Sequence, residues 1–426
     1  MTVISISESS SRILVDERLD PRRANSIGIF WKSKLGLPGP AIQVTETSSG
    51  DSLRTDHVVG VLKVGEKILE IFPKFLSDRE HDDWRQPFLN LVRFAHGHIG
   101  RSPDDVPASI VPASSFADVI GAIFDGELKQ SFLRGLPRSY RERVGDSSIL
   151  EGALDLSRLN SLVLFDGRIP FRSPFLSARS PISELIGWSA GRLAALCSAP
   201  ELVFDLVRWN QRFAQLGNHR LPSNWKTIKV PRSFGYLQSL IEIGQLLANS
   251  QFPGIEYGES KFGFPGFVWR TADIYERAIY RLNSEALFGT GITVSKKSFG
   301  LLSIGGSSVM RTIPDLVYSK QGISVLVGDS KYKNRGSCPE PSDTYQVMAA
   351  ADVTGCSRSI LFYPSPGSEI GLKELDVSGF GQAQKIVVVD VGLDCFATKA
   401  SIESAKKLLR SNIIELLGNK QVSIVR

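Results

Sequence analysis

The stretch Arg311–Lys333 reads RTIPDLVYSKQGISVLVGDSKYK and gives the clearest structural signal in the chain. Asp315 follows a proline and precedes one apolar run, and a second apolar run ends at Asp329. The short Gly-containing turn between the two runs is typical of a β-hairpin. Such a hairpin brings Asp315 and Asp329 to the same end of two paired strands. Lys331 lies two residues after Asp329, so these two side chains share one face of the second strand.

Two carboxylates and an ammonium group at one point suit metal-dependent hydrolysis of a phosphodiester. The Asp315 and Asp329 carboxylates and the Ser330 backbone carbonyl offer the oxygen ligands that Mg²⁺ or Mn²⁺ prefers. Such a cation polarises a phosphate and lowers the pKa of a bound water. Lys331 orients or helps to deprotonate that water and offsets charge in the transition state. Because Asp-x-Lys is also common on solvated surface strands, the hypothesis depends on the hairpin that joins the two aspartates.

The flanking sequence predicts an α/β domain with a central mixed sheet. Upstream, residues 271–289 carry apolar side chains at helical spacing, and Glu276 lies beside this apolar stripe. Glu276 is therefore either a solvated helix residue or a third carboxylate of the metal site. Downstream, the pattern predicts a helix, two strands and a last helix, in the order 342–355, 359–363, 385–391 and 400–417.

Three further passages accompany this hairpin in a fixed order. Near the N-terminus, GVLKVG at 60–65 leads to LEIFPK at 69–74, which predicts a second hairpin that ends in a Pro-Lys pair. After the core, DTYQVM at 343–348 falls on the predicted helix, and LFYP at 361–364 falls on the predicted strand.

Together with IPD at 313–315 and GDSKYK at 328–333, these passages resemble the McrC family. Its members are the endonuclease subunits of McrBC-type 5-methylcytosine restriction systems, which defend against phage and other foreign DNA, and their nuclease domain has the PD-(D/E)xK fold. The resemblance implies a Mg²⁺-dependent deoxyribonuclease that cuts DNA as an endonuclease. The implied catalytic and metal-binding residues are Asp315, Asp329, Lys331, Ser330 and Glu276. The implied auxiliary DNA contacts are Gln346, Lys333 and Tyr332. The pattern departs from related nucleases at Ala350, where a tyrosine is common.

The chain has no GxxxxGK[ST] motif, so it carries no P-loop of its own. The resemblance implies that nucleotide hydrolysis belongs to a separate partner, a McrB-like AAA+ GTPase or ATPase, which this chain binds and stimulates. By the same resemblance, the first two-thirds of the chain would dock on that motor and the last third would cut DNA.

The net charge of +6 is concentrated in one segment. Residues 134–232 contain fifteen Lys/Arg and eight Asp/Glu, a local excess of +7 that leaves about −1 elsewhere. Because arginine suits phosphate oxygens, this segment contacts DNA or an acidic partner, or it is a solvated surface. Four scattered cysteines argue against a zinc site and against a disulfide framework. The polar start of the chain and the absence of an apolar run near ~20 residues predict a cytoplasmic protein without a membrane segment.

The expected organisation is α+β overall and has four parts. A β-rich N-terminal region and a mostly helical, arginine-rich middle region precede a Gly/Pro-rich linker and the nuclease domain, with boundaries at 1–83, 84–251, 252–265 and 266–426. A fragment that ends near Gln251 is therefore expected to fold alone.

Two other functions are compatible with the sequence. One is a stand-alone PD-(D/E)xK enzyme, either a restriction enzyme or a RecB-like repair nuclease, whose basic segment binds DNA directly. The other is a non-enzymatic adaptor of an AAA+ motor, in which the hairpin is only structural. Cleavage without a motor would favour the first, and a dispensable Asp329 would favour the second.

Overall fold

The computed structural model describes most of the chain and divides it into two compact units. Unit 1 comprises residues 1–116 and 254–426, and unit 2 comprises residues 117–253. The described residues are 2–14, 19–48, 50–76, 84–96, 115–136, 138–159, 167–215, 221–249, 255–257, 260–262, 266–304, 307–377 and 384–418.

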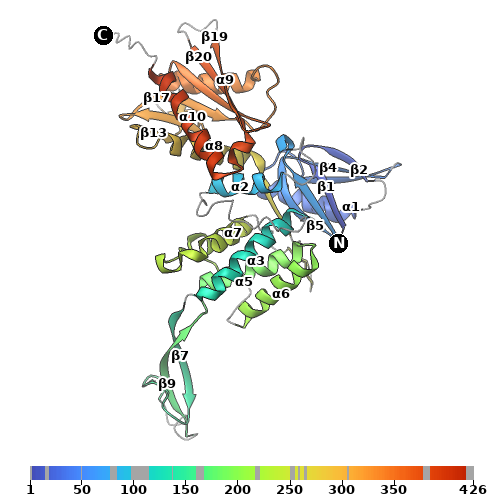
Figure 1. Cartoon of the computed structure of the whole chain (residues 1–426), viewed down its shortest axis with the longest axis vertical. Coiled ribbons are helices and arrows are strands. Elements are labelled where there is room, and N and C mark those ends of the chain that lie inside the picture. The colour runs from blue at the N-terminus through green and yellow to red at the C-terminus, as the bar shows by residue number, and fades with distance from the viewer. Residues whose placement is uncertain are drawn as a thin grey trace. The chain divides into compact units, whose positions relative to one another are not determined.

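A six-stranded mixed sheet lies at the centre of the C-terminal part of unit 1 (Figure 1). Its order is β13-β16-β17-β18-β20-β19, in which β18 is parallel to both of its neighbours and the other pairs are antiparallel. The elements are β13 (Ile292–Ser295), β16 (Leu316–Lys320), β17 (Ile323–Ser330), β18 (Arg358–Ser365), β19 (Ile370–Val377), β20 (Gln384–Gly392), α8 (Thr271–Ala286), α9 (Pro341–Thr354) and α10 (Lys399–Gly418).

Helices cover both faces of this sheet. On one face, Val327 of β17 shares a core cluster with Ala351 of α9. Since successive strand residues point to opposite faces, Leu326 and its cross-strand partner Tyr318 face the other side. There the Tyr318 hydroxyl donates a hydrogen bond of 2.7 Å to Asn283 Oδ1 of α8. The expected α/β layout with a central mixed sheet is confirmed, including the hairpin β16–β17, whereas the two edge strands β13 and β19 were not predicted.

The N-terminal hairpin β5–β6, also predicted, belongs to a four-stranded sheet that a distant segment completes. The order is β1-β6-β5-β12, and β12 follows unit 2 in the sequence. Gly60 makes this pairing possible, because its φ is +145° and a Cβ there would lie 2.1 Å from the Phe267 carbonyl oxygen. The strands are β1 (Thr2–Ser7), β5 (Val58–Val64), β6 (Lys67–Phe72) and β12 (Gly266–Arg270).

A buried contact connects this sheet to the C-terminal part of unit 1. Glu8, next after β1, is 2% exposed, and its Oε1 accepts a hydrogen bond of 2.8 Å from Thr271 Oγ1 at the start of α8. Burial raises the pKa of Glu8 to about 7, although the hydrogen bond from Thr271 and the nearby Lys74 ammonium group act in the opposite direction.

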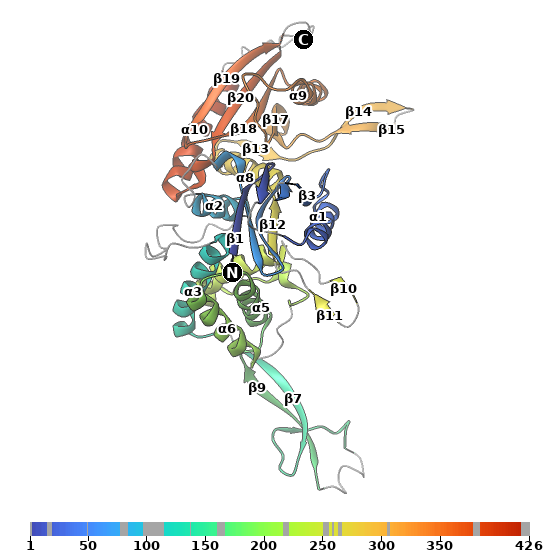
Figure 2. The same ribbon diagram turned by 90° about the vertical axis from the view of Figure 1, so that its right-hand side faces the viewer.

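The remaining elements of unit 1 surround these two sheets. A three-stranded sheet of order β2-β4-β3 packs with α1, and two separate hairpins, β10–β11 and β14–β15, stand outside the larger sheets (Figure 2). The elements are α1 (Pro21–Leu35), α2 (Arg85–His96), β2 (Ser11–Leu14), β3 (Ile42–Thr47), β4 (Gly50–Thr55), β10 (Ile255–Tyr257), β11 (Ser260–Phe262), β14 (Phe299–Ile304), β15 (Ser307–Thr312) and two 3-10 helices, Lys74–Leu76 and Leu393–Phe396.

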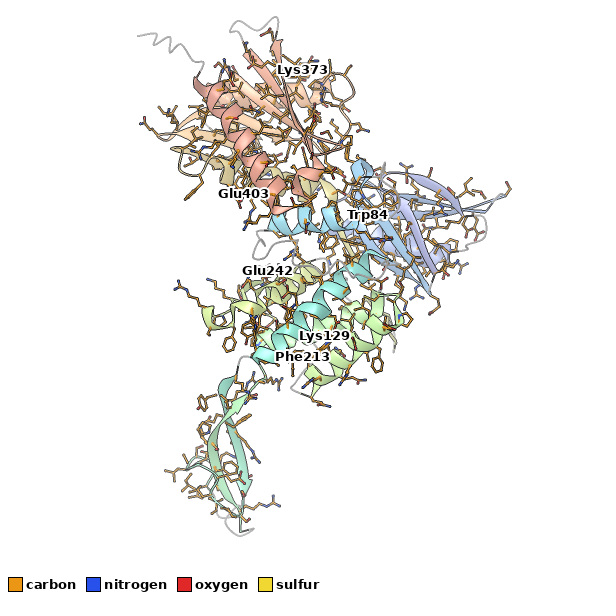
Figure 3. All side chains as sticks on the ribbon, viewed as in Figure 1. Trp84, Lys129, Phe213, Glu242, Lys373 and Glu403 are labelled. Carbon is orange, nitrogen blue, oxygen red and sulfur yellow. The ribbon has the colours of Figure 1, made fainter. Side chains whose placement is uncertain are left out.

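Unit 2 combines helices with a long β-hairpin (Figure 1). Among the helices, Lys129 pairs with Asp125 and Asp205, each at 2.7 Å, and Phe213 is buried (Figure 3). The hairpin β7–β9 has β8 as a short third strand in the order β7-β9-β8. The elements are α3 (Phe116–Arg134), α5 (Pro181–Leu196), α6 (Pro200–Ala214), α7 (Gln238–Asn249), β7 (Ser139–Ser147), β8 (Ala153–Leu154), β9 (Ile169–Ser177) and two 3-10 helices, Trp225–Thr227 and Arg232–Leu237.

The structure groups the residues differently from the four-part division expected above. The helix α2 belongs to unit 1, where Phe88 lies 6.2 Å, between ring centroids, from Trp269 of β12; Trp84, just before α2, belongs to the same aromatic cluster (Figure 3). The segment expected to be a linker, 252–265, contains the paired strands β10 and β11, and its other residues lie outside the described part of the chain. The middle of the chain is mostly helical as expected, but the hairpin β7–β9 was not predicted.

Candidate active site

The hairpin β16–β17 brings Asp315 and Asp329 together as the sequence predicts. Leu316 pairs with Gly328, so one further step places Asp315 opposite Asp329. The Asp315 backbone N–H lies 3.4 Å from Asp329 Oδ1 and donates to it. The backbone N–H and the hydroxyl of Ser330 both donate to Asp315 Oδ2, at 3.0 and 2.8 Å. The Asp315 carboxylate is therefore held in one orientation toward β17.

Lys331 lies beside Asp329 and is held by the helix that follows. Its Nζ is 2.5 Å from Asp329 Oδ2 and donates a 2.7 Å hydrogen bond to Gln346 Oε1 of α9. Asp329 points to the face that Val327 and α9 share, because the two residues are two apart in β17. The sequence-predicted Gln346 thus contacts the sequence-predicted lysine directly.

Glu276 reaches the site through a residue that the sequence analysis did not single out. Lys296, just after β13, donates hydrogen bonds to Glu276 Oε1 and to Asp315 Oδ1, the latter at 3.1 Å. Lys296 is separated from Asp315 by the hairpin β14–β15, and no motif marks it.

The electrostatics of the site show a shortage of positive charge around Asp329. Burial and, after it, the charge of Asp315 raise the pKa of Asp329 to about 7, although Lys331 acts against both. Burial would raise the pKa of Asp315 as well, but hydrogen bonds from Asp329, Ser330 and Lys296 outweigh it and lower this pKa. Burial also raises the pKa of Glu276, although Lys296 opposes the shift. Asp329 therefore pairs with Lys331, whereas Asp315 and Glu276 share Lys296.

The donors fit a divalent cation that is held by two carboxylates. Mg²⁺ is commonly bound through one or two carboxylates with water completing the shell, and Asp315 with Asp329 supplies two. Asp329 Oδ2 is buried and lies 2.5 Å from the Lys331 ammonium group. Within the described residues, no set of three or more Asp, Glu, His or Cys side chains is arranged to hold a metal ion. Glu276 is bonded to Lys296 instead of joining the two aspartates.

Lys333 and Tyr332, the expected auxiliary residues, lie just past the end of β17. Lys333 pairs with Glu340 at 2.5 Å and with Asp343 at 3.0 Å. The Tyr332 ring lies against Phe75 and Tyr275, with ring centroids 5.1 and 5.7 Å apart, and its hydroxyl is buried. Because β17 ends at Ser330, Lys333 does not continue the strand face of Asp329 and Lys331.

Residues 53–364 match the family described as McrBC 5-methylcytosine restriction system component. The chain belongs to this family. The matched range includes the N-terminal hairpin, both aspartates and Lys331, so the site lies within the part of the chain that defines the family.

Two solved structures share the fold of this McrBC-family chain. One is a chain of the refined half-complex from a tetradecameric assembly of Thermococcus gammatolerans McrB AAA+ hexamers with bound McrC; it has a TM-score of 0.69 and 15% identity, and the match covers 97% of this chain and 100% of that one. The other comes from the cryo-EM structure of the Thermococcus gammatolerans McrBC complex, with a TM-score of 0.50, 16% identity and coverage of 67% and 88%. No curated protein matches the sequence. None of the described helices is long and apolar enough to cross a membrane.

Proposed function

We propose that this chain is the DNA endonuclease subunit of a McrBC-like, modification-dependent restriction system. The observation that carries the proposal is the meeting of Asp315, Asp329 and Lys331 at the end of one hairpin. The Asp315 backbone nitrogen lies 3.4 Å from Asp329 Oδ1, and Lys331 Nζ lies 2.5 Å from Asp329 Oδ2. Membership of the McrBC family supports the biological setting.

Asp315 and Asp329, with the Ser330 carbonyl, would hold Mg²⁺ or Mn²⁺. When bound, the cation would polarise the scissile phosphate and lower the pKa of a bound water. The raised pKa of Asp329 supports this role, because a carboxylate that is poorly compensated by protein cations gains most from a divalent one.

Lys331 would stabilise the charge that develops on the phosphate. Its ammonium group is anchored by Asp329 and Gln346, so it is oriented before substrate binds and loses little freedom in the transition state. Gln346 would then act by positioning Lys331, and Lys296 would hold Glu276 and Asp315 in place.

A McrB-like AAA+ motor is the proposed partner, since the chain has no P-loop. The hairpin β7–β9 of unit 2 offers a suitable docking surface. Large apolar side chains are exposed along it, including Tyr140, Phe175 and Leu176, and arginines such as Arg141 and Arg143 alternate with them. Apolar anchors surrounded by arginine are typical of protein interfaces.

The test is DNA cleavage by the purified chain with and without Mg²⁺ and with and without the AAA+ protein of the same system. We expect cleavage of methylated DNA only when the chain, the motor, its nucleotide and Mg²⁺ are all present, and none with Asp329→Asn. Cleavage by the chain with Mg²⁺ alone would show a stand-alone nuclease. Full restriction by Asp329→Asn would show an adaptor without catalytic function.

A further inference from the structure

The hairpin β14–β15 is an insertion directly beside the active site. It begins three residues after Lys296 and ends three residues before Asp315, so both of its ends lead into the site. Its strands pair only with each other and belong to neither large sheet (Figure 2). Near its base it contacts α9, the helix that carries Gln346.

All charged side chains of this insertion are positive. Residues 296–314 contain Lys296, Lys297 and Arg311 and not one Asp or Glu. Lys297 and Arg311 are exposed, and Arg311 Nε donates to Ser298 Oγ at 2.7 Å, which holds the guanidinium group at the base of the hairpin. A purely cationic segment next to a phosphodiester site favours a polyanion over a protein surface of mixed charge.

The hairpin also exposes large apolar side chains. Leu302, Val309 and Met310 are 60%, 63% and 51% exposed. Apolar side chains on a β-ribbon contact thymine methyl groups in the major groove or wedge against base steps in the minor groove. Leu302 and Met310 are cross-strand partners, so these two exposed side chains adjoin on the ribbon, and an exposed apolar surface of this kind points to a binding site.

The dimensions agree with a duplex. A strand of six residues is roughly 20 Å long, and the major groove is about 12 Å wide and admits a two-stranded ribbon. A duplex whose phosphate reaches Asp315 and Lys331 therefore lies within the reach of the hairpin.

We propose that the hairpin β14–β15 enters a groove of duplex DNA next to the scissile phosphate, with Lys297 and Arg311 on the backbone and Leu302, Val309 and Met310 against the bases and sugars. This inference rests on the proposed nuclease function. The hairpin, which lies outside the metal site, then sets the affinity for DNA and does not affect the rate of the chemical step.

The test compares DNA binding by full-length variants in an Asp329→Asn background, measured by anisotropy of a labelled duplex over a range of salt. Lys297→Ala should weaken binding and reduce the slope of log Kd against log salt by about one. Leu302→Ser with Val309→Ser should weaken binding about tenfold and leave the salt slope unchanged, since no phosphate contact is lost. In otherwise wild-type protein the same changes should raise KM and preserve kcat.

Matched controls come from β19, at the opposite edge of the six-stranded sheet. Leu372→Ser removes an exposed apolar side chain and Lys373→Ala an exposed lysine, labelled in Figure 3, and neither should change Kd or KM. If the wild-type chain cleaves DNA but the hairpin variants bind and cleave like these controls, the inference fails and the nuclease function stands. Loss of motor binding with unchanged DNA binding would show that the hairpin contacts protein, which also overturns it. A wild-type chain that neither binds nor cleaves DNA with its motor would instead overturn the proposed function and the inference together.

Discussion

Lys331 and Lys333 are two residues apart and have different partners, which makes them a natural pair for a test of catalysis at the scale of single residues. Lys331 contacts the buried Asp329 and Gln346, whereas Lys333 contacts Glu340 and Asp343 beyond the strand. Only the first of the two is positioned by the aspartates of the site.

Lys331→Ala should therefore reduce cleavage about 100-fold or more, because the charge that it directs at the phosphate is lost. Lys333→Ala should cost about 1 kcal/mol of stability or less, as for other partly exposed ion pairs, and should leave the cleavage rate unchanged. Single-turnover cleavage and thermal unfolding of both variants measure the two effects. Equal and small effects on cleavage would contradict the catalytic role of Lys331.

At this scale the sequence predicted the contacts that follow from strand geometry and missed those that do not. Asp315, Asp329 and Lys331 meet because a short turn fixes the register of β16 and β17. Lys296 donates hydrogen bonds to Glu276 of α8 and to Asp315, although the hairpin β14–β15 separates it from Asp315 in the sequence. No local sequence pattern predicts these contacts. Whether Glu276 assists metal binding stays a prediction.

At the scale of elements, periodicity was a reliable guide where a strand or helix buries one face in the core. The helices α8, α9 and α10 and the strands β17, β18 and β20 lie within a few residues of their predicted bounds. Several of the missed strands are exposed: β19 has no buried residue, and β14–β15 and β7–β9 are ribbons outside the large sheets. With no buried face, such strands lack the alternation on which prediction depends. The strand β12, also missed, is the exception, because Phe267, Val268 and Trp269 are buried.

Glu8 connects the end of β1 to the start of α8, and its ionisation should be visible in the stability of the protein. Its pKa is raised from 4.5 to about 7 by burial, so the folded state prefers the protonated form. The stabilisation is fully present below the unfolded-state pKa and is lost as pH rises through the folded-state pKa. Glu8→Gln cannot ionise, so the free energy of unfolding of the variant, relative to wild type, should rise by about 3 kcal/mol between pH 4 and pH 8.

Denaturant unfolding at a series of pH values measures this difference. The control is Glu66→Gln in the exposed turn between β5 and β6, which makes the same chemical change outside the buried contact. A flat difference for Glu8→Gln would show that Glu8 is ionised in the folded protein at no cost.

At the scale of the whole molecule, the sequence suggested linear parts, but unit 1 is discontinuous. Its N-terminal sheet needs β12, which follows unit 2 in the chain, and Glu8 needs Thr271. Strand patterns identify neighbours in sequence and carry no information on a partner strand beyond an inserted unit.

This organisation changes which fragment should fold alone. Residues 117–253 contain all of unit 2 and should unfold cooperatively on heating, as followed by far-UV circular dichroism. A fragment that ends near Gln251, expected from the sequence to fold, leaves β5 without β12 and Glu8 without its donor, and should aggregate or lack a cooperative transition. Cooperative unfolding of this longer fragment at the temperature of the full chain would contradict the discontinuous unit.

The pairing of β12 with β5 also sets an order of events on the ribosome. β12 is synthesised about two hundred residues after β5, which at ~5–20 residues per second is a delay of roughly 10–40 s. During this interval unit 2 emerges complete, while the nascent N-terminal sheet has an open edge at β5. The inserted unit therefore emerges first, and unit 1, which holds Asp315, Asp329 and Lys331, closes only after β12 and the strands of the six-stranded sheet have followed it.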